Sequence, residues 1–260
     1  LGWLVIGYLG SLGVMLVASF WHLNELSGEV TQGFSLDNYD VLFTDEVYRT
    51  IAMRTIGIAA AVTVTDVILA FPIAFYMAKV AKPRMQSLLV VAVLLPLWSS
   101  YLVKGGAWRL MLSEDGVINW ALEPFGLHGP GYGTAAVWLV MSYMWLPYMI
   151  IPIYAGLERI PDSILSASED LGAKPWRTFR KVILPMSFPA VVAGSIFTFS
   201  LTLGDYITPA NVGTKQFIGN VVYSNFVSNL PLAAAITTIP IVVMVIYLLV
   251  ARKLGAFDHV

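Results

Sequence analysis

A single acidic residue, Asp66, lies near the middle of an apolar run, residues 55–77, that is long enough to cross a bilayer. An ionised carboxylate at the centre of a membrane costs on the order of 3 kcal/mol, so the protein must compensate it. Two interpretations stay open. Either Asp66 faces a translocation path and attracts a cationic substrate, or it is a buried, protonated acid that hydrogen-bonds to a neighbouring helix.

Five further residues near the ends of apolar runs could recognise a cation. Asp205 and Tyr206 follow one such run, and the two interpretations given for Asp66 apply to them as well. Trp98, Tyr101 and Trp108 could stack on an alkylammonium chain, because an aromatic face attracts a positive charge. Tryptophan and tyrosine also gather at membrane interfaces without any ligand. A substrate path or an interfacial belt would therefore explain these aromatic residues.

The sequence lacks the patterns of several other chemistries. It has no G-x-x-x-x-G-K-[S/T] run, so a nucleotide such as ATP would have to bind another chain. It has no H-E-x-x-H pattern, and His22, His128 and His259 lie outside the apolar runs, where we expect them to be solvated. Without cysteine, disulfides and thiolate metal sites are excluded. We expect no metal or cofactor in this chain, and an intramembrane enzyme is not favoured.

The composition requires a bilayer as solvent. Hydrophobic residues make up 58% of the 260 residues and charged residues 12%, with a mean hydropathy of +0.76. No linker divides the chain, so residues 1–260 are expected to form a single all-α membrane domain. Spans of roughly 20 residues are predicted at six places. They cover residues 1–21, 55–77, 86–103, 133–154, 187–203 and 232–250.

Basic residues predict the orientation, because cytoplasmic loops hold the excess of lysine and arginine. Ten of them fall on one side, namely Lys79, Lys82, Arg84, Arg159, Lys174, Arg177, Arg180, Lys181, Arg252 and Lys253. Five fall on the other, namely Arg49, Arg54, Lys104, Arg109 and Lys215. An even number of spans puts both termini on one side, so both are predicted to be cytoplasmic. Since the sequence opens at Leu1 without methionine, we expect a longer native N-terminus.

The loop of about residues 157–186 is predicted to face the cytoplasm and to form a helix, a turn and a second short helix. Pro161 and Asp162 are a helix-start signal, Gly172 offers a stop, and Pro175 can open the next helix. An apolar stripe is expected to pack against the membrane helices, while the charged residues stay in water. The loop therefore predicts a docking surface for a soluble partner.

The spacing within this loop resembles a known motif. The permease subunits of ABC importers carry E-A-A, three residues, G, nine residues, I, one residue, L-P. The corresponding residues here are Ser166-Ala167-Ser168, Gly172, Val182 and Leu184-Pro185. All intervals match, but Ser166 stands where glutamate is usual and Ser168 where alanine is usual. A contact made by that glutamate would have to come from the Ser166 hydroxyl or from Glu169.

The resemblance implies a type I ABC importer permease of the bacterial cytoplasmic (inner) membrane. In that family the motif sits in a cleft of an ATPase subunit and passes its closing motion to the membrane helices. The ATPase-coupling residues implied here are Ser166, Ala167, Ser168, Glu169, Leu171, Gly172 and Ala173. The implied partners are a second homologous permease, expected to be a paralogue in a heterodimer, two ATPase subunits that bind ATP and magnesium, and an extracytoplasmic substrate-binding protein. No nucleic acid is implied.

More of the chain resembles the spermidine/putrescine, PotB-like branch of these permeases. The matching segments are residues 96–103, 107–108, 116–119, 154–161 and 203–210. The branch implies a small cationic solute, such as a polyamine, and the path residues named above: Asp66, Trp98, Tyr101, Trp108, Asp205 and Tyr206. Permeases for other amines, amino-acid derivatives or iron are similar enough to stay as alternatives. A secondary transporter that uses Asp66 as a proton or sodium site is a further alternative, because it would need no ATPase.

Overall fold

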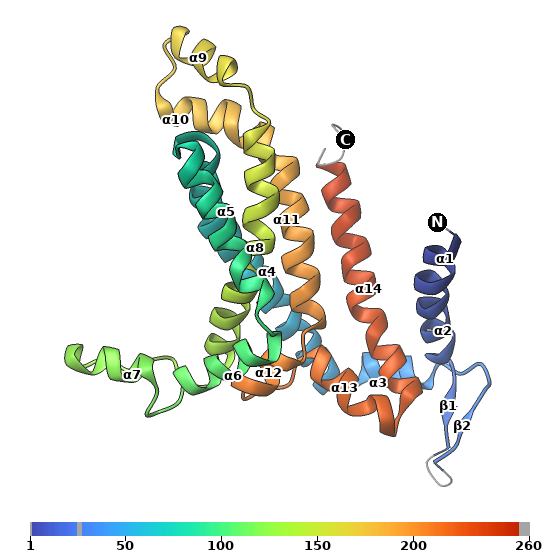
Figure 1. Ribbon diagram of the computed structural model, residues 1–260. Coiled ribbons are helices and arrows are strands. Elements are labelled where there is room, and N and C mark those ends of the chain that lie inside the picture. Colours follow the sequence, from blue (N-terminus) through green and yellow to red (C-terminus); the bar gives the residue numbers. More distant parts are fainter. Residues whose placement is uncertain (1, 25–27, 255–260) are drawn as a thin grey trace.

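A computed structural model of the chain describes residues 2–24 and 28–254, most of which are helical (Figure 1). A short antiparallel hairpin, in which His22 pairs with Thr31, follows the first helices. The described elements, in chain order, are α1 (Gly2–Leu4), the π-helical turn η1 (Val5–Leu9), α2 (Gly10–Ala18), β1 (His22–Leu23), β2 (Val30–Thr31), α3 (Asp37–Thr44), α4 (Glu46–Phe75), the π-helical turn η2 (Tyr76–Val80), α5 (Pro83–Trp98), α6 (Tyr101–Met111), α7 (Val117–Leu122), the 3-10 turn η3 (Glu123–Phe125), α8 (Thr134–Glu158), α9 (Asp162–Asp170), α10 (Pro175–Thr178), the π-helical turn η4 (Phe179–Ile183), α11 (Leu184–Gly204), α12 (Ile207–Val212), α13 (Ile218–Ser228) and α14 (Leu230–Lys253).

Within the described residues, four continuous helices are long and apolar enough to cross a membrane. They are Glu46–Val80, Thr134–Glu158, Pro175–Gly204 and Leu230–Lys253. The pair α5 and α6 passes the same test together but bends by 90°. The apolar helix at the start of the chain, Val5–Ala18, is shorter. The structure thus has four or five candidate spans, and the count of six stays a prediction.

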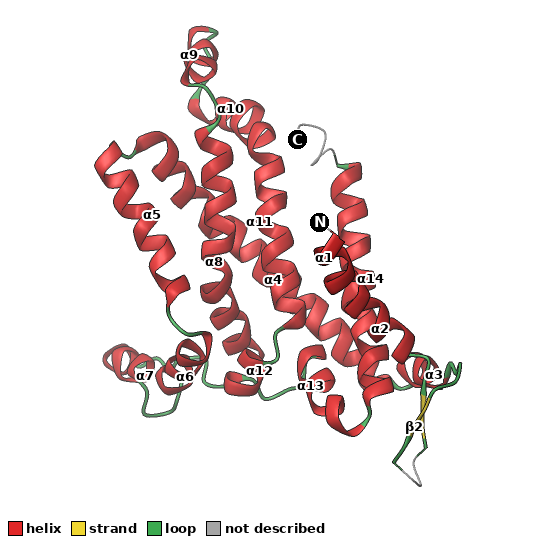
Figure 2. Cartoon of the chain, turned by 45° about the vertical axis from the view of Figure 1, so that its right-hand side comes forward, coloured by secondary structure: helices red, strands yellow, loops and turns green. Residues whose placement is uncertain are grey.

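The core of the bundle lies where α4, α8 and α11 pack together (Figure 2). Small residues bring α8 and α11 close. A Cβ atom on Gly194 of α11 would come within 2.7 Å of the Met149 sulfur, and one on Gly156 of α8 would come within 2.3 Å of the Ala190 Cβ. Helices that approach this closely gain dispersion contacts, which are a main source of stability between helices in a bilayer. These three helices form the frame to which the other elements attach.

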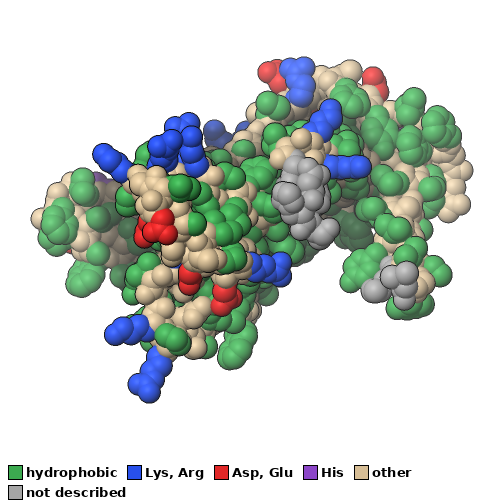
Figure 3. All heavy atoms as spheres, turned by 90° about the horizontal axis from the view of Figure 1, so that it is seen from above, with side chains coloured by type: hydrophobic (Ala, Val, Ile, Leu, Met, Phe, Trp, Pro, Cys, Tyr) green, Lys and Arg blue, Asp and Glu red, His purple; other side chains and the backbone are tan. Residues whose placement is uncertain are grey.

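The short helices divide between the two ends of the bundle. The pair α9 and α10 projects from one end, whereas α3, α6, α7, α12 and α13 lie at the other (Figures 1 and 2). The start of α1 and the end of α14 lie toward the α9 end (Figure 1). Seen from that end, the surface carries several lysine and arginine side chains among hydrophobic ones (Figure 3). The structure shows no membrane side, so the cytoplasmic placement of both termini stays a prediction.

The prediction of one continuous span over residues 86–103 is wrong. Helix α5 ends at Trp98, and Ser99 is extended and Ser100 non-helical before α6 begins. The Pro96 carbonyl accepts hydrogen bonds from the Ser99 hydroxyl (2.9 Å) and from the Lys104 ammonium (3.0 Å). Side-chain donors therefore satisfy a carbonyl that the helix leaves unpaired near its end, so the chain can turn sharply there.

The prediction of a separate second helix after Gly172 is correct for its start but wrong for its end. Helix α10 begins at Pro175, then continues through η4 into α11 without a break. Proline normally interrupts a helix because it lacks an N–H donor. Here Pro185 lies at the second residue of α11, directly after the wide π-helical turn, so the chain passes it without a break. The loop is thus joined to α11 by one 30-residue helix.

Candidate functional site

Helix α9 carries the motif residues and ends in a turn that needs glycine. Gly172 has φ +74°, a conformation that residues with a Cβ rarely adopt. The Gly172 N–H donates to the Glu169 carbonyl (2.8 Å) and the Ala173 N–H donates to the Ser168 carbonyl (3.1 Å), which closes the helix. Apart from its own chain neighbours, no described residue has an atom within 4 Å of the place where a Cβ would be on Gly172. The turn therefore requires glycine for its backbone angle and not for space.

The predicted coupling residues lie together at the tip of this projection (Figure 1). None of the α9 residues is buried, and the Leu171 side chain is 88% exposed. The hydroxyl of Ser166 donates to the Asp162 carbonyl within α9 (3.1 Å). Ser168 instead shares a hydrogen bond of 2.9 Å with Thr178 of α10. The two serines that depart from the motif thus make contacts inside the loop.

The base of the projection packs against the membrane helices, as the apolar stripe predicts. Phe179 meets Phe71 of α4 edge to face, with 5.5 Å between the ring centroids, and stacks on Trp176 at 5.4 Å. Ile183 is buried in the same apolar cluster, which includes residues of α4 and α8. The base is anchored, while the tip stays free to contact another molecule.

Asp66 lies inside the bundle. Its side chain is 0% exposed, and among the described residues neither carboxylate oxygen has a hydrogen-bond partner. Val62 and Ala70, one turn before and one turn after it on α4, are also fully buried and belong to clusters with residues of α8. Ser142 and Trp145 of α8 likewise have a buried polar atom without a partner. Buried polar atoms are normally paired, so these unpaired ones set this part of the core apart.

Tyr101 and Asp205 are brought together and join α6 to α12. One oxygen of the Asp205 carboxylate accepts from the N–H groups of Ile207 (2.9 Å) and Thr208 (3.3 Å), which begins α12. The other oxygen accepts from the Tyr101 hydroxyl. That hydroxyl also lies 2.6 Å from the Thr208 hydroxyl. In this conformation the Asp205 carboxylate is therefore occupied by donors of the chain itself.

The other predicted path residues have separate surroundings. Trp108 packs against Tyr143 of α8 at 5.3 Å, while Trp98 at the end of α5 is 84% exposed. Tyr206 stacks on Tyr223 of α13 with 4.5 Å between ring centroids and lines a cavity of about 460 Å³. The structure thus unites Tyr101 with Asp205, but it does not gather all six residues into one site within this chain.

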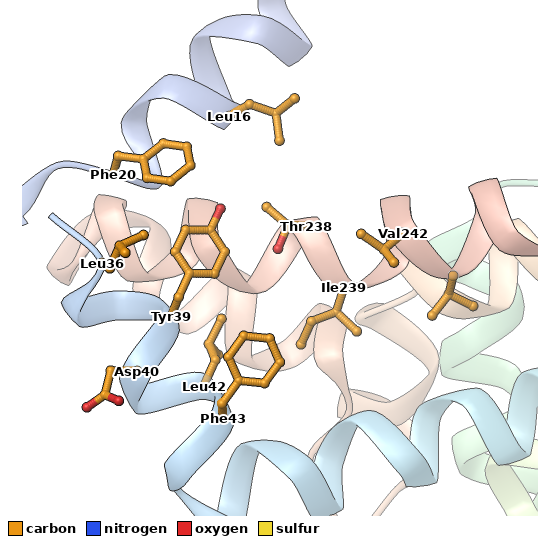
Figure 4. A pocket seen from close by; sticks show the side chains of 11 residues that line it. Leu16, Phe20, Leu36, Tyr39, Asp40, Leu42, Phe43, Thr238, Ile239 and Val242 are labelled. Carbon is orange, nitrogen blue, oxygen red and sulfur yellow. The ribbon is translucent and has the colours of Figure 1, made fainter. Parts of the chain in front are cut away.

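An apolar groove of about 870 Å³ lies between α2, α3 and α14 (Figure 4). Residues in or directly beside α2 and α3 and residues of α14 line it, and none of the predicted path residues is among them. Figure 4 shows Leu16 and Phe20 on one wall, facing Thr238, Ile239 and Val242 on α14. The hydroxyl of Tyr39, which also lines the groove, shares a hydrogen bond of 2.7 Å with Ser19.

An apolar helical bundle with several candidate membrane spans, from one end of which the pair α9 and α10 projects, defines a multi-span membrane protein. The chain belongs to the family described as binding-protein-dependent transport system inner membrane component, whose sequence profile matches residues 51–256. The family is a transport component of the inner membrane and not an enzyme family. The resemblance to ABC importer permeases is thereby confirmed, as is the location in the inner membrane.

Two relatives and two solved structures are similar along nearly the whole chain. The inner membrane ABC transporter permease protein YdcU of Escherichia coli strain K12 is 45% identical over 98% of this chain and 87% of the relative. The spermidine/putrescine transport system permease protein PotB of the same strain is 28% identical over 96% of this chain and 92% of the relative. A bacterial ABC transporter for the import of alginate has a TM-score of 0.67 at 17% identity, covering 97% of this chain and 90% of that one. A structure of bacterial alginate ABC transporter in complex with an alginate pentasaccharide-bound periplasmic protein gives 0.69 at 17% identity, with the same coverage.

Proposed function

We propose that this ABC importer permease forms the path for a small cationic solute, a polyamine such as spermidine or putrescine. The observation that carries this proposal is the similarity over 96% of the chain to permeases named for spermidine and putrescine. The name of the relative with 45% identity states no solute, so the solute class rests on the PotB-like relatives.

The charge at the proposed outer end supports a cation. Four exposed carboxylates, Asp37, Asp40, Asp45 and Glu46, lie in or beside α3 and at the start of α4, at the end of the molecule opposite α9. Together with Arg49, which lies in the same stretch, these residues still give residues 37–49 a net negative charge, and such an excess raises the local concentration of cations. A dication arriving from outside would be enriched at this end before it enters the path.

The proposed assembly contains a second permease, which we expect to be a paralogue, two ATPase subunits and an extracytoplasmic binding protein. The ATPases bind ATP and magnesium and hold the α9 projection, whose exposed tip suits a cleft in another protein. Their closing motion shifts the permeases between inward-open and outward-open states. ATP and the loaded binding protein shift this equilibrium only by their differential affinity for the two states.

Within this assembly Asp66, Trp98, Tyr101, Trp108, Asp205 and Tyr206 remain our proposed path residues. Asp66 supports the proposal because its carboxylate lies unpaired within the bundle, on a helix that the alternating motion would move. An ion-coupled secondary transporter is not favoured, because the family depends on a binding protein.

The experiment is uptake by proteoliposomes that contain the complete complex. With ATP at the ATPase side and loaded binding protein at the other, we expect uptake of labelled putrescine or spermidine, and no uptake without ATP. This chain reconstituted alone under a proton or sodium gradient serves as the control. Uptake by the chain alone would contradict the ABC mechanism, whereas ATP-driven uptake confined to neutral or acidic solutes would contradict the cationic solute.

A further inference from the structure

Lys79 holds the junction between α8 and α9. It lies in η2, where the long helix that contains α4 ends, and its side chain is only 10% exposed. Its ammonium group donates to the Ile160 carbonyl (2.6 Å), which follows α8, and to the Asp162 carboxylate (2.9 Å), the first residue of α9. One cation thus connects the end of α4 with both sides of this junction.

Helix α9 has few other attachments. None of its residues is buried, so apolar burial contributes little to holding it. Leu165 is half-buried against the apolar cluster of α4 and α8, and Ser168 hydrogen-bonds to Thr178. Among the polar side-chain contacts within the described residues, only those of Ser168 and Asp162 link α9 to another element. A small number of directional contacts must therefore set the angle of α9.

These two contacts lead to different membrane helices. Thr178 lies in α10, which continues into α11, whereas Lys79 lies in the turn that continues α4. Helices α4 and α11 both pack on α8 in the core. A displacement of α9 could thus reach one core helix through the Ser168–Thr178 hydrogen bond and another through the Lys79–Asp162 ion pair.

We propose that Lys79 is a positioning residue that carries the movement of α9 to α4, in parallel with the route through α11. This inference rests on the proposed function, in which α9 is moved by an ATPase. Hydrogen bonds from an ionised donor are the shorter and stronger kind, and a mostly buried ammonium that loses its acceptors is penalised. The junction and the end of α4 therefore move together, while the flexible lysine stem permits small changes of angle.

The test replaces Lys79 by methionine, which keeps the length of the side chain and removes the charge. The matched control is Lys82→Met, because Lys82 lies in the same connection, is exposed and makes no side-chain hydrogen bond or ion pair with the described residues. In the reconstituted complex we expect Lys79→Met to keep ATP hydrolysis within about twofold and to lower the solute moved per ATP by about tenfold. Lys82→Met should leave this ratio unchanged, and Lys79→Arg should recover part of it.

A second measurement reports the distance between α9 and the start of α5, which follows Lys79 in the chain. The chain has no cysteine, so spin labels can be attached through the pair Ser163→Cys and Arg84→Cys, on α9 and at the start of α5. Both positions are exposed. We expect a narrow distance distribution in the otherwise native chain, a broad one with Lys79→Met and a narrow one with Lys82→Met. Asp162→Ala should add little to Lys79→Met, because the two residues act on the same contact.

The outcomes separate the two proposals. If the native complex does not couple ATP hydrolysis to uptake, the proposed function fails, while the label distances still report whether Lys79 fixes α9. The native complex could instead couple ATP hydrolysis to uptake while Lys79→Met behaves like Lys82→Met in both measurements. The positioning role of Lys79 is then refuted and the proposed function stands. Should Lys79→Met fail to assemble, Lys79→Gln, which keeps a donor, takes its place in both measurements with the same expected direction.

Discussion

At the scale of single residues, Asp66 carries the most specific information about the path. A carboxylate among apolar helices costs free energy unless something pairs with it, and this one has no hydrogen-bond partner in the described chain. Replacing such a group by an apolar one is often neutral or stabilising. Stability therefore does not explain an aspartate at this place, which makes a role in another conformation the better hypothesis.

The first prediction concerns the neutral variant Asp66→Asn. It keeps the shape of the side chain and removes the negative charge, so we expect uptake of a dication to fall roughly fivefold more than uptake of a neutral solute. Thr65→Val is the matched control. Thr65 is adjacent, and its hydroxyl accepts from Trp138 at 3.0 Å, so this change also removes a polar group from the same turn. Uptake of a graded series of solutes measures the difference, and an equal loss for all of them would make Asp66 structural.

At the scale of elements, the turn after α9 determines whether the projection keeps its shape. Gly172 has a positive φ and open space around it. The strain of a substitution there is conformational, on the order of 1–2 kcal/mol for a residue with a Cβ. Residues that tolerate this conformation should be accepted, whatever their size.

The second prediction therefore compares two substitutions at Gly172. Asparagine visits the left-handed conformation readily, whereas a β-branched valine does not. We expect Gly172→Val to abolish transport and to uncouple ATP hydrolysis while the protein still inserts, and Gly172→Asn to keep at least about half of the transport. Transport and ATP hydrolysis are measured on the same complex. Normal uptake with Gly172→Val would count against α9 as the coupling element.

Much of this loop could be predicted from sequence because its signals are local. Pro161, Gly172 and Pro175 each restrict the backbone where they stand, and the structure begins and ends the helices there. Hydropathy does not predict the 90° bend after Trp98, because the apolar run continues across it. The signal present was the pair Ser99 and Ser100, two polar residues after a proline in an apolar run.

The contacts of the candidate site were less predictable, because they join residues that are distant in sequence. Tyr101 meets Asp205, and Lys79 meets Asp162, through helix packing that no local pattern encodes. From the sequence, Lys79 is only one of the basic residues that predict orientation. Its role at a junction depends on η2 ending beside α8, which only the packed bundle shows.

At the scale of the whole molecule, the two ends differ in what they present. One end carries α9, α10 and the basic residues beside them, and the other carries the flat group of short helices α6, α7, α12 and α13 (Figures 1 and 2). The proposed transfer of solute from a binding protein to the cytoplasm needs such a difference between the two ends. The assignment of the α9 end to the cytoplasm is the step on which the coupling proposal depends.

The last prediction tests this assignment with single cysteines, which the 260-residue sequence lacks. Lys174 precedes α10 at one end, Lys215 precedes α13 at the other, and both are exposed. In intact cells with a permeable outer membrane, we expect a membrane-impermeant maleimide to label Lys215→Cys and to label Lys174→Cys only after the inner membrane is opened. The excess of basic residues at the α9 end is the physical reason, since positively charged loops stay in the cytoplasm. Labelling of Lys174→Cys in intact cells would place the α9 projection outside, where no ATPase could hold it.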